Sequence, residues 1–518
     1  MAPFLRKSCG RGVDLHVIGH QLWHMIRPLL AVILLSYVTP MLAETPAPHT
    51  REPGVQQQVE TALGSAPSGT RFGLLVVDDQ GREVVSINPD QRFIPASNTK
   101  LFTTAAAYAL LPGMEQPDVD GGTEVSLVAA PGGSAPTVVL RGRGDARMSS
   151  APDCRIDCLA ELADAVAAKT KVVGDVVGDD TLFPDQRWSP GMSWNNLGSN
   201  DATAASALSL DSNQLYASAL PGVPGQPPAL TVPPYITIRN DAVTTPAGSK
   251  TTLELEHTLN SREFRLFGGL PADAGPWHEW IGIDDPAHYA AWTLAEMLRA
   301  RGVRVKGAVR SRHRPTSSAD DPAQRIAPTQ VVAVPAIAAP LAKLTPPPLA
   351  DDVTVINKAS QNHHAEVLLR RIGSRRGSGS LADGLASERA LFATAGVPRE
   401  GYDFSDGSGM STYNRVSPRA AVTLLRWIDA QSWGRAFYAS LPIAGVDGTL
   451  QHRFVGTPLA SNLSAKTGTL NATNAISGTF RAASGQRLIF ALFANDVPDG
   501  QSAVAVMETA LLIVAARN

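Results

Sequence analysis

The chain has 518 residues, of which 44% are hydrophobic and 18% are charged, as in a soluble globular protein. This length predicts two or three domains with an ample hydrophobic core. The formal net charge of −2 provides no basis for nucleic-acid binding, which requires basic surfaces. The 39 prolines and 44 glycines predict many turns and short strands.

Residues 1–43 are predicted to be a secretory signal peptide. A charged start at Met25-Ile26-Arg27 precedes an apolar run from Leu29 to Val38 and a small residue, Ala43. This run is too short to span a bilayer, and no later run is longer. We therefore expect export to the periplasm and no stable membrane span after cleavage. The segment before Met25 is long and polar for a signal, which suggests that translation starts at Met25. An uncleaved anchor is the alternative.

Residues 44–115 are predicted to form the first part of a mixed α/β domain, after a flexible leader at 44–58 that is rich in Pro, Thr and Glu. Apolar residues from Phe72 to Val77, a turn of Asp and Gly, and a second run from Glu83 to Ile87 predict a β-hairpin. The Ala- and Leu-rich run from Lys100 to Leu111 predicts a mostly buried helix.

The start of this helix carries the first candidate motif, Ser97-Asn98-Thr99-Lys100. A serine followed three residues later by a lysine on a helix places an amine one turn from a hydroxyl. A serine becomes a good nucleophile only when a base accepts its proton, and a lysine can be that base. Lys100 is the only lysine in the chain with a serine three positions before it. Because serine is also a good helix N-cap, a purely structural role is the alternative for this motif taken alone.

Residues 116–328 are predicted to be an inserted accessory domain that is mostly β. Glycine and proline separate short apolar runs, such as Val125 to Val128 and Thr137 to Leu140. Cys154 and Cys158 form an even pair in an exported chain, which suggests a local disulfide, with two free thiols as the alternative. A metal site is not expected, because no further cysteine remains to complete one.

Residues 329–518 are predicted to be the second part of the first domain. Ser360-Gln361-Asn362 is predicted to open a helix that extends to Arg371. Lys466-Thr467-Gly468-Thr469 precedes two runs typical of paired strands, Ala475 to Arg481 and Arg487 to Ala494, and a final helix is predicted from Gln501 to Ala516. The fold class is therefore α/β (α+β), with helices packed on an antiparallel sheet that both chain ends build.

The three motifs are weak separately and specific together. Ser360-Gln361-Asn362 adds a second hydroxyl and an amide, and Lys466-Thr467-Gly468-Thr469 adds a second ammonium. This set, in this order, is typical of serine β-lactamases and penicillin-binding proteins. Other polar residues are given ordinary roles. Glu366 is expected in a surface salt bridge, and glycine-flanked acidic residues are expected to shape turns. Those acidic residues are Asp403, Asp406 and Asp447, and the histidines expected to be ordinary helix residues are His363 and His364.

Five segments, one of which contains the first motif, resemble class C, type 4 penicillin-binding proteins, the serine-type D-Ala-D-Ala carboxypeptidase/endopeptidases of the bacterial cell wall. They are Phe93 to Leu101, Asp406-Gly407-Ser408-Gly409-Met410-Ser411, Leu441 to Leu450, Asp179 to Phe183, and Ala207-Leu208-Ser209-Leu210. The resemblance covers nearly all of the mature chain. It implies a β-lactamase/transpeptidase-like domain that carries a large insertion after the nucleophile helix.

The resemblance implies a role for each catalytic residue. Ser97 would be the acylated nucleophile and Lys100 its general base, while Asn362 would orient Lys100. Ser360 would relay a proton to the leaving amine, with Lys466 behind it. The backbone amides of Ser97 and a threonine of the third motif, Thr469, would form the oxyanion hole. Lys100 must be neutral to act as a base, and we expect burial beside the Lys466 ammonium to lower its pKa.

The resemblance also implies a substrate-binding set. Its members are Thr467, Gly468, Thr469, Leu470 and Asn471 around the third motif, and Asp180 of the insertion, which would seat an amine of the substrate's side chain. One departure concerns Thr412, because the family usually has an arginine there that binds the substrate's carboxylate. Arg415 lies three residues further on.

We therefore predict an exported serine D-Ala-D-Ala carboxypeptidase/endopeptidase that acts on peptidoglycan stem peptides through an acyl-enzyme and is acylated by β-lactams. No cofactor or metal is expected, and the motifs carry no signal for an oligomeric state. A serine β-lactamase is one alternative, and rapid turnover of penicillin would distinguish it. A catalytically silent cell-wall-binding protein of the same fold is the other, although the four intact polar residues Ser97, Lys100, Ser360 and Lys466 argue against it.

Overall fold

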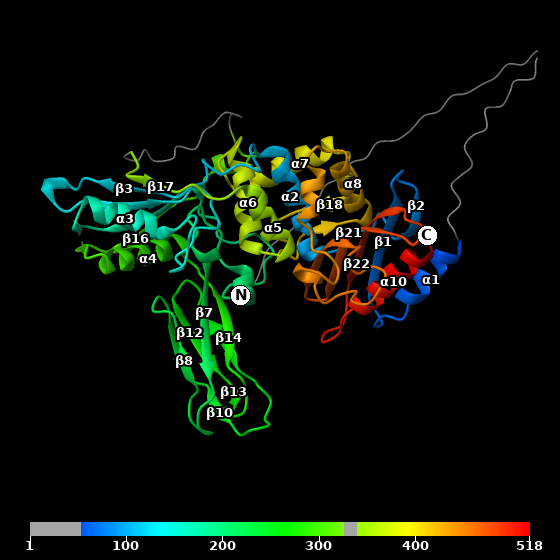
Figure 1. Cartoon of the computed structure of the whole chain (residues 1–518), viewed down its shortest axis with the longest axis horizontal. Helices are drawn as coiled ribbons and strands as arrows, with labels where there is room; N and C mark the ends of the chain where they lie inside the picture. The colour runs from blue at the N-terminus through cyan, green and yellow to red at the C-terminus, as the bar shows by residue number, and fades with distance from the viewer. Residues whose placement is uncertain (1–52, 326–338, 518) are drawn as a thin grey trace, which may run out of the picture. The chain divides into compact units, whose positions relative to one another are not determined.

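The computed structural model describes residues 53–325 and 339–517, so the predicted signal peptide lies outside the described residues (Figure 1). The first described element is helix α1 (Pro53–Leu63). The predicted leader is therefore wrong over residues 53–58. Val55, Val59 and Leu63 recur at helical spacing and are buried, so packing decides the helical conformation there.

An antiparallel five-stranded sheet, in the order β2-β1-β22-β21-β20, joins the two ends of the chain. Leu74 of β1 pairs with Leu492 of β22, more than four hundred residues away in sequence. The predicted hairpin is confirmed as the β1–β2 pair, and the two predicted strands after the third motif are confirmed as the β21–β22 pair. The strands are β1 (Arg71–Asp78), β2 (Glu83–Ile87), β20 (Ser464–Leu470), β21 (Thr473–Arg481) and β22 (Arg487–Asn495).

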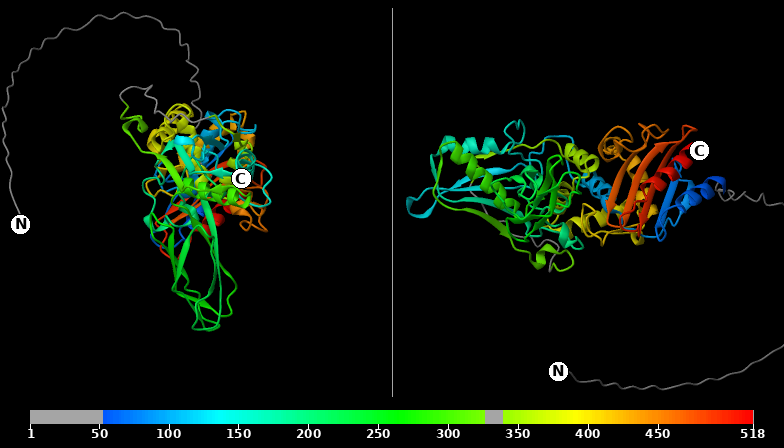
Figure 2. Two further views of the ribbon diagram at one scale, coloured as in Figure 1. Left: turned by 90° about the vertical axis from the view of Figure 1, so that its left-hand side faces the viewer. Right: turned by 90° about the horizontal axis from the view of Figure 1, so that it is seen from below.

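Helices cover both faces of this sheet. Successive side chains along each strand point to opposite faces, and both sets are apolar in β1, so each face packs against helices. Leu74 and Val76 pack with α1 and α10 (Val504–Arg517), the blue and red helices against the sheet in Figure 2. Leu75 and Val77 pack on the opposite face with α8 (Pro418–Asp429) and with α2 (Thr99–Leu110), which begins two residues after Ser97. Further helices of this layer are α5 (Leu349–Lys358), α6 (Asn362–Ser374), α7 (Leu381–Thr394) and α9 (Gly434–Ala439).

The start of α6 differs from the sequence prediction. The helix begins at Asn362, and Ser360 precedes it in the left-handed region with φ 60°. The side chain of Gln361 accepts a hydrogen bond from the backbone amide of His363 and so caps the helix. Ser360 therefore lies in the sharp turn between α5 and α6 rather than inside a helix.

The segment between α2 and α5 contains several smaller sheets. The largest is β16-β6-β4-β3-β17, in which the predicted strands near residues 125 and 137 are confirmed. Strand β17 follows residue 328, where we expected the insertion to end, and it pairs with β3. This sheet packs with two helices, and its elements are β3 (Glu124–Val128), β4 (Thr137–Arg141), β6 (Val176–Pro184), β16 (Val309–Arg314), β17 (Ala342–Lys343), α3 (Leu159–Lys169) and α4 (Pro286–Ala300).

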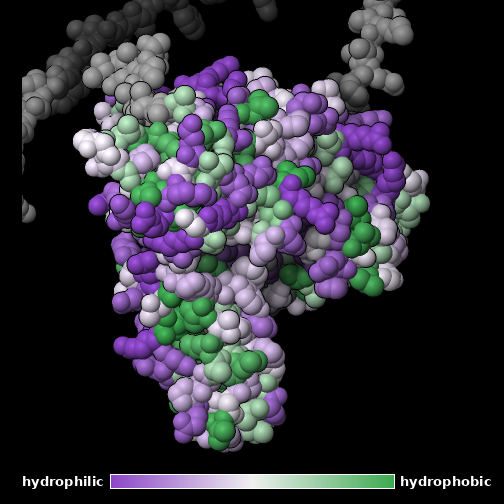
Figure 3. Space-filling view, turned by 60° about the vertical axis from the view of Figure 1, so that its left-hand side comes forward, coloured by the Kyte–Doolittle hydropathy of each residue, from purple (hydrophilic) through white to green (hydrophobic). Residues whose placement is uncertain are grey.

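Two three-stranded sheets, β14-β7-β8 and β11-β12-β9, form a second strand-rich part of this segment. Figure 3 shows hydrophobic residues gathered over this part of the surface. Its strands are β7 (Gln214–Leu220), β8 (Ala229–Thr231), β9 (Thr237–Asn240), β11 (Glu254–His257), β12 (Glu263–Phe267) and β14 (Trp277–Gly282). The remaining short strands are β5 (Val172–Val173), β10 (Val243–Thr245), β13 (Gly269–Pro271), β15 (Arg304–Val305), β18 (Tyr402–Asp403) and β19 (Arg415–Val416).

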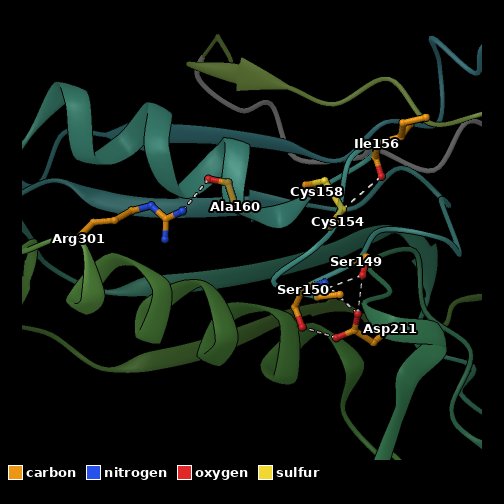
Figure 4. Close-up of a disulfide and its surroundings, with 9 residues drawn as sticks. Ser149, Ser150, Cys154, Ile156, Cys158, Ala160, Asp211 and Arg301 are labelled. Carbon is orange, nitrogen blue, oxygen red and sulfur yellow. Dashed lines mark hydrogen bonds between the residues drawn. A yellow bond between two sulfur atoms is a disulfide. The ribbon is translucent and has the colours of Figure 1, made fainter.

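The predicted disulfide between Cys154 and Cys158 is confirmed, with 5.8 Å between the Cα atoms (Figure 4). It closes the loop directly before α3. Beside it, Asp211 accepts hydrogen bonds from the backbone amide of Ser150, at 2.8 Å, and from the hydroxyl of Ser149. The loop is thus attached to the start of β7.

Among the described residues, no helix has the length and hydropathy needed to cross a bilayer.

Candidate active site

The first motif places the serine and the lysine as their spacing predicts. A short 3-10 helix (Ala96–Asn98) carries Ser97 into α2, where Lys100 lies in the first turn. The Nζ atom of Lys100 lies 2.9 Å from the Oγ atom of Ser97. Ser97 is half-buried and reachable from the cavity described below, whereas Lys100 is fully buried. The serine is thus available to a substrate and its partner amine is shielded from water.

Two further contacts orient the Lys100 amine. It donates to Oδ1 of Asn362 at 2.5 Å and to the backbone carbonyl of Ser408 at 2.6 Å. The Asn362 amide donates in turn to the backbone carbonyl of Asp201 at 2.8 Å. Asn362 therefore connects the candidate base to the inserted segment, and this contact was not foreseen from the sequence.

Burial lowers the pKa of Lys100 to about 7, although the charges of Asp406, Glu366 and Asp201 act against this shift. We expected burial beside the Lys466 ammonium to lower this pKa; the burial is confirmed, whereas the charge of Lys466 is not among the main causes. Burial is also the first cause of the strongly lowered pKa of Lys466, and the charge of Lys100 adds to it. Two amines in one dry site thus disfavour double protonation, and the low pKa of Lys100 suits a general base near neutral pH.

Lys466 connects the third motif to the second. Its Nζ atom lies 3.0 Å from Oγ of Ser360 and 2.9 Å from the carbonyl of Thr467. The side chain of Asn98 donates to the backbone carbonyl of Lys466 and so attaches β20 to the nucleophile helix. The left-handed turn at Ser360 is what directs this hydroxyl toward β20. All three motifs therefore meet, although more than three hundred and fifty residues separate the first from the last.

These side chains surround a cavity of about 670 Å³. The predicted residues that line it are Ser97, Ser360, Asn362, Thr467, Gly468, Thr469, Leu470 and Asn471. Eight others were given no site role from the sequence, namely Asn196, Ser199, Asp201, Ala359, Met410, Thr449, Arg453 and Val504. Met410 and Thr449 lie inside segments that carried the family resemblance, whereas nothing local in the sequence marks Asn196, Ser199 or Asp201.

Gly468 owes its lack of a side chain to a close approach. A Cβ atom there would lie 2.8 Å from the carbonyl oxygen of Pro95 and 3.0 Å from the backbone nitrogen of Ser97. Glycine thus lets β20 pass directly beside the nucleophile, so that the amides of Ser97 and Thr469 can face the same cavity. Two such donors on one side of the nucleophile are what an oxyanion hole needs.

Asp180 does not line this cavity. It is buried, and its carboxylate oxygens are bonded to Nδ1 of His313 at 2.9 Å and to the hydroxyl of Ser206 at 2.9 Å. Burial raises its pKa despite these partners. The carboxylate that does line the cavity is that of Asp201, in the short helix Asn200–Ala202.

The expectation of a surface salt bridge at Glu366 is wrong, because this side chain is only 4% exposed. Glu366 accepts hydrogen bonds from the backbone amides of Gly407 and Ser408, each at 3.0 Å, and pairs with Arg370 at 2.9 Å. It therefore holds the loop whose Ser408 carbonyl contacts Lys100. Glu366 can be buried because the backbone amides of Gly407 and Ser408 and the Arg370 guanidinium satisfy its carboxylate, and a sequence pattern does not reveal such backbone donors.

Asp406 shapes a turn, as expected, by accepting hydrogen bonds from the amides of Gly409 and Ser411. Burial, with the charge of Glu366 as the second cause, raises the pKa of Asp406 to about 6.

Of the two histidines on α6, His364 pairs with Asp352. Among the described residues, no group of three or more His, Cys, Asp or Glu side chains is arranged to hold a metal ion.

Thr412 donates to the carbonyl of Gly191 at 3.0 Å, and Arg415 donates to the carbonyls of Thr412 and Asn414. Neither Thr412 nor Arg415 lines the cavity. The arginine that the resemblance implies at position 412 would have bound the substrate's carboxylate there. Arg453 does line it, and its guanidinium pairs with Glu508 at 2.5 Å. The positive charge at this cavity therefore comes from another segment of the chain.

Comparison with known proteins is consistent with this geometry. Residues 55–513 match the D-Ala-D-Ala carboxypeptidase 3 (S13) family. The chain is 32% identical over 500 residues to a D-alanyl-D-alanine carboxypeptidase of an Actinomadura species, covering 93% of this chain and 87% of that protein. It is 24% identical over 445 residues to D-alanyl-D-alanine carboxypeptidase DacB of Haemophilus influenzae, and this match covers 84% of this chain and 87% of that protein.

The fold is also that of a solved structure. Penicillin binding protein 4 (dacB) from Haemophilus influenzae superposes with a TM-score of 0.74 at 22% identity, and the match covers 88% of this chain and 98% of that chain. A second structure of the same protein, complexed with a novel β-lactam, gives a TM-score of 0.67 at 21% identity. At these identities the superpositions support the shared architecture, and the roles of individual residues come from the contacts above.

Proposed function

The chain belongs to the D-Ala-D-Ala carboxypeptidase 3 (S13) family of peptidases, and from this premise we propose that Ser97 cleaves the D-Ala-D-Ala bond of peptidoglycan stem peptides through an acyl-enzyme. The observation that carries the proposal is the 2.9 Å approach of the buried Lys100 amine to the Ser97 hydroxyl. Relatives that share most of their length with this chain are D-alanyl-D-alanine carboxypeptidases, which supports the same reaction here.

Acylation begins when neutral Lys100 accepts the Ser97 proton and Oγ attacks the carbonyl carbon of the penultimate D-Ala. The backbone amides of Ser97 and Thr469 stabilise the oxyanion, and loss of one such donor typically costs about 2.7–4 kcal/mol of barrier. The bond to the terminal D-Ala breaks, and its nitrogen receives a proton through Ser360. Lys466, 3.0 Å from Ser360 Oγ, resupplies that proton. Water then attacks the ester and gives a proton through Ser360 to Lys466, while Lys100 returns the proton that it accepted to the departing Ser97 oxygen.

Substrate binding falls to the residues around β20. Thr467 and Thr469 provide hydroxyl groups for the terminal carboxylate, and Arg453 provides positive charge in the same cavity. We assign to Asp201, instead of Asp180, the role of seating an amine on the substrate's side chain. Asp201 lines the cavity, whereas the oxygens of Asp180 are already bonded to His313 and Ser206.

β-Lactams present an analogous amide carbonyl in a strained ring and would acylate the same serine. The predicted signal peptide, which lies outside the described residues, supports export to the periplasm, where peptidoglycan is accessible. The sequence alternatives of a β-lactamase and a silent wall-binding protein differ from this proposal in the fate of penicillin.

The test is the intact mass of the mature protein after incubation with benzylpenicillin, with Ser97→Ala and the control Ser464→Ala in parallel. We expect one stable drug adduct on the wild type and on Ser464→Ala, and none on Ser97→Ala. Drug consumption without an adduct would indicate a β-lactamase. If no adduct forms and the drug is not consumed, the enzymatic proposal is contradicted. Release of D-Ala from a pentapeptide that ends in D-Ala-D-Ala then measures the carboxypeptidase reaction directly.

A further inference from the structure

A second cavity, of about 450 Å³, lies between strands β11 and β14, and we call it the β11–β14 groove. Both strands are edges of their sheets, since β11 ends the sheet β11-β12-β9 and β14 ends the sheet β14-β7-β8. The groove is lined by Trp194, Asn195, Gly198, Ser199, Leu253, Glu254, Leu255, Glu256, His257, Leu259, Phe264, Phe267, Trp277, Glu279 and Trp280. None of its members belongs to the three catalytic motifs.

Aromatic rings and carboxylates dominate this lining. The side chain of Trp280 is 49% exposed and that of Trp194 is 74% exposed. Trp280 is held by Tyr216 on the neighbouring strand, with 4.9 Å between the ring centroids. A large ring that is both exposed and fixed in place offers a flat binding surface at little cost in side-chain entropy.

Three glutamates give the groove a negative charge. They are Glu254 and Glu256 on β11 and Glu279 on β14. Glu256 lies 3.9 Å from Arg265, and the salt bridges of the described residues include neither Glu254 nor Glu279. Carboxylates accept hydrogen bonds and repel anions. The groove therefore suits a ligand that is rich in hydroxyl or amide donors and carries no negative charge of its own.

The groove adjoins the catalytic cavity. Ser199 lines both, and the short helix Trp194–Asn196 connects them, with Asn195 in the groove and Asn196 in the catalytic cavity. A ligand in the β11–β14 groove therefore lies next to a peptide that is bound at Ser97. This adjacency points to a single polymeric substrate that occupies both.

We propose that the β11–β14 groove binds the glycan chain to which the stem peptide is attached, a polymer of N-acetylated amino sugars. The proposal rests on the function proposed above and names a second part of the same substrate. The C–H faces of sugar rings stack on exposed indole rings, and sugar hydroxyls and N-acetyl amides donate to the glutamates. A free peptide fits less well, because its terminal carboxylate meets the negative charge of the three glutamates.

Glycan binding would assign the inserted segment a function in substrate binding, separate from the reaction at Ser97. A peptide that remains attached to the glycan gains the contacts of the groove, and a detached peptide does not. The two kinds of substrate should therefore differ in kcat/KM although the reacting bond is the same. Removal of groove contacts should abolish that difference without altering the acylation chemistry.

The experiment compares Trp280→Ala and Glu279→Gln with the wild type on two substrates. One is a free pentapeptide that ends in D-Ala-D-Ala, and the other is the same pentapeptide on soluble glycan chains. Tyr413→Ala is the control, because Tyr413 is exposed but does not line the groove. We expect kcat/KM on the glycan-linked substrate to fall about tenfold in Trp280→Ala, the loss of one strong aromatic contact. The free peptide and the control variant should show no change.

Direct binding of chitotetraose, measured by isothermal titration calorimetry, tests the groove without catalysis. We expect wild type and Ser97→Ala to bind equally and Trp280→Ala to bind more weakly. Equal losses on both substrates, no loss on either, or chitotetraose binding that Trp280→Ala leaves intact would each overturn the proposal. Displacement of chitotetraose by the free pentapeptide would assign the groove to peptide instead. A failure of benzylpenicillin to acylate Ser97 would overturn the proposed catalysis and leave the chitotetraose result standing.

Discussion

The α-carbon of Gly468 lies so close to Ser97 that a Cβ atom on it would be 3.0 Å from the Ser97 backbone nitrogen. That nitrogen is one of the two amides assigned to the oxyanion hole. The third motif thus meets the nucleophile through backbone rather than side chain. The glycine in this motif is therefore required by distance.

Gly468→Ala tests this contact. Because the added methyl must displace β20 or the Ser97 amide, we expect benzylpenicillin acylation to slow about a hundredfold, the effect of losing one oxyanion donor. The measurement is the acylation rate from intact mass against time. Gly275→Ala is the control, since nothing lies within 4 Å of a Cβ atom built there. An unchanged rate in Gly468→Ala would contradict the close approach.

The acylation rate should depend on pH through Lys100. Its pKa is lowered to about 7, and only the neutral amine can accept the Ser97 proton. We therefore expect kcat/KM for acylation to rise with pH, to reach half its plateau near pH 7, and to level off above it. Stopped-flow acylation with a chromogenic cephalosporin measures the profile between about pH 5.5 and about pH 9. A profile that is flat across neutral pH would contradict the assignment of Lys100 as base.

Glu366→Gln should destabilise the fold. Burial favours the neutral acid, but the Arg370 guanidinium outweighs burial and lowers the pKa of Glu366. Since the folded-state pKa lies below the unfolded value, the stabilising contribution is present above the unfolded pKa and lost as pH falls through the folded one. Removal of one partner leaves Arg370 buried without its charge partner, which typically costs about 3–5 kcal/mol.

Urea denaturation at pH 7 measures this loss, with the exposed Glu161→Gln as the matched control. Because Glu366 also binds the amides of Gly407 and Ser408, the variant should acylate more slowly as well. Equal stability of Glu366→Gln and wild type would show that the buried pair contributes nothing net.

Asp201→Asn should alter substrate preference. If Asp201 seats a side-chain amine, the variant loses about 1 kcal/mol or more with an amine-bearing peptide and much less with its N-acetylated form. The readout is the ratio of kcat/KM values for the two peptides. Asp180→Asn should leave that ratio unchanged, because Asp180 does not line the cavity. The reverse pattern would restore Asp180 to the role that the sequence suggested.

Replacement of both cysteines by serine should have a local effect. The loop closed by Cys154 and Cys158 is short, so its closure contributes about 2 kcal/mol in the chain-entropy treatment. We expect a lower free energy of unfolding and an unchanged rate of penicillin acylation. Urea denaturation and intact-mass kinetics measure the two quantities. A loss of acylation would indicate that this loop supports the active site at long range.

Local sequence was sufficient for features whose partners lie nearby in the chain. The β1–β2 hairpin and the β21–β22 pair follow from alternating apolar residues and intervening turns. The spacing of Ser97 and Lys100 predicted their 2.9 Å contact, because one helical turn sets that distance. The disulfide between Cys154 and Cys158 belongs to the same class, since four residues separate the two cysteines.

Contacts between distant segments decided what the sequence could not. Glu366 is buried because backbone donors at Gly407 and Ser408 meet it, and a sequence pattern does not show such donors. Asp180 faces His313 instead of the cavity, and Asp201 takes a place there that no motif marks.

By itself, the sequence determined the chemistry of the site, because the residue types in the three motifs specify a nucleophile, a base and a second amine. Only the tertiary structure decided how those groups act. Burial, which depends on every segment packed around Lys100, lowers its pKa to about 7. The left-handed turn at Ser360 and the close passage of Gly468 bring separate motifs into one cavity. The physical reason is that reactivity depends on distance and solvation, and both are properties of the packed chain.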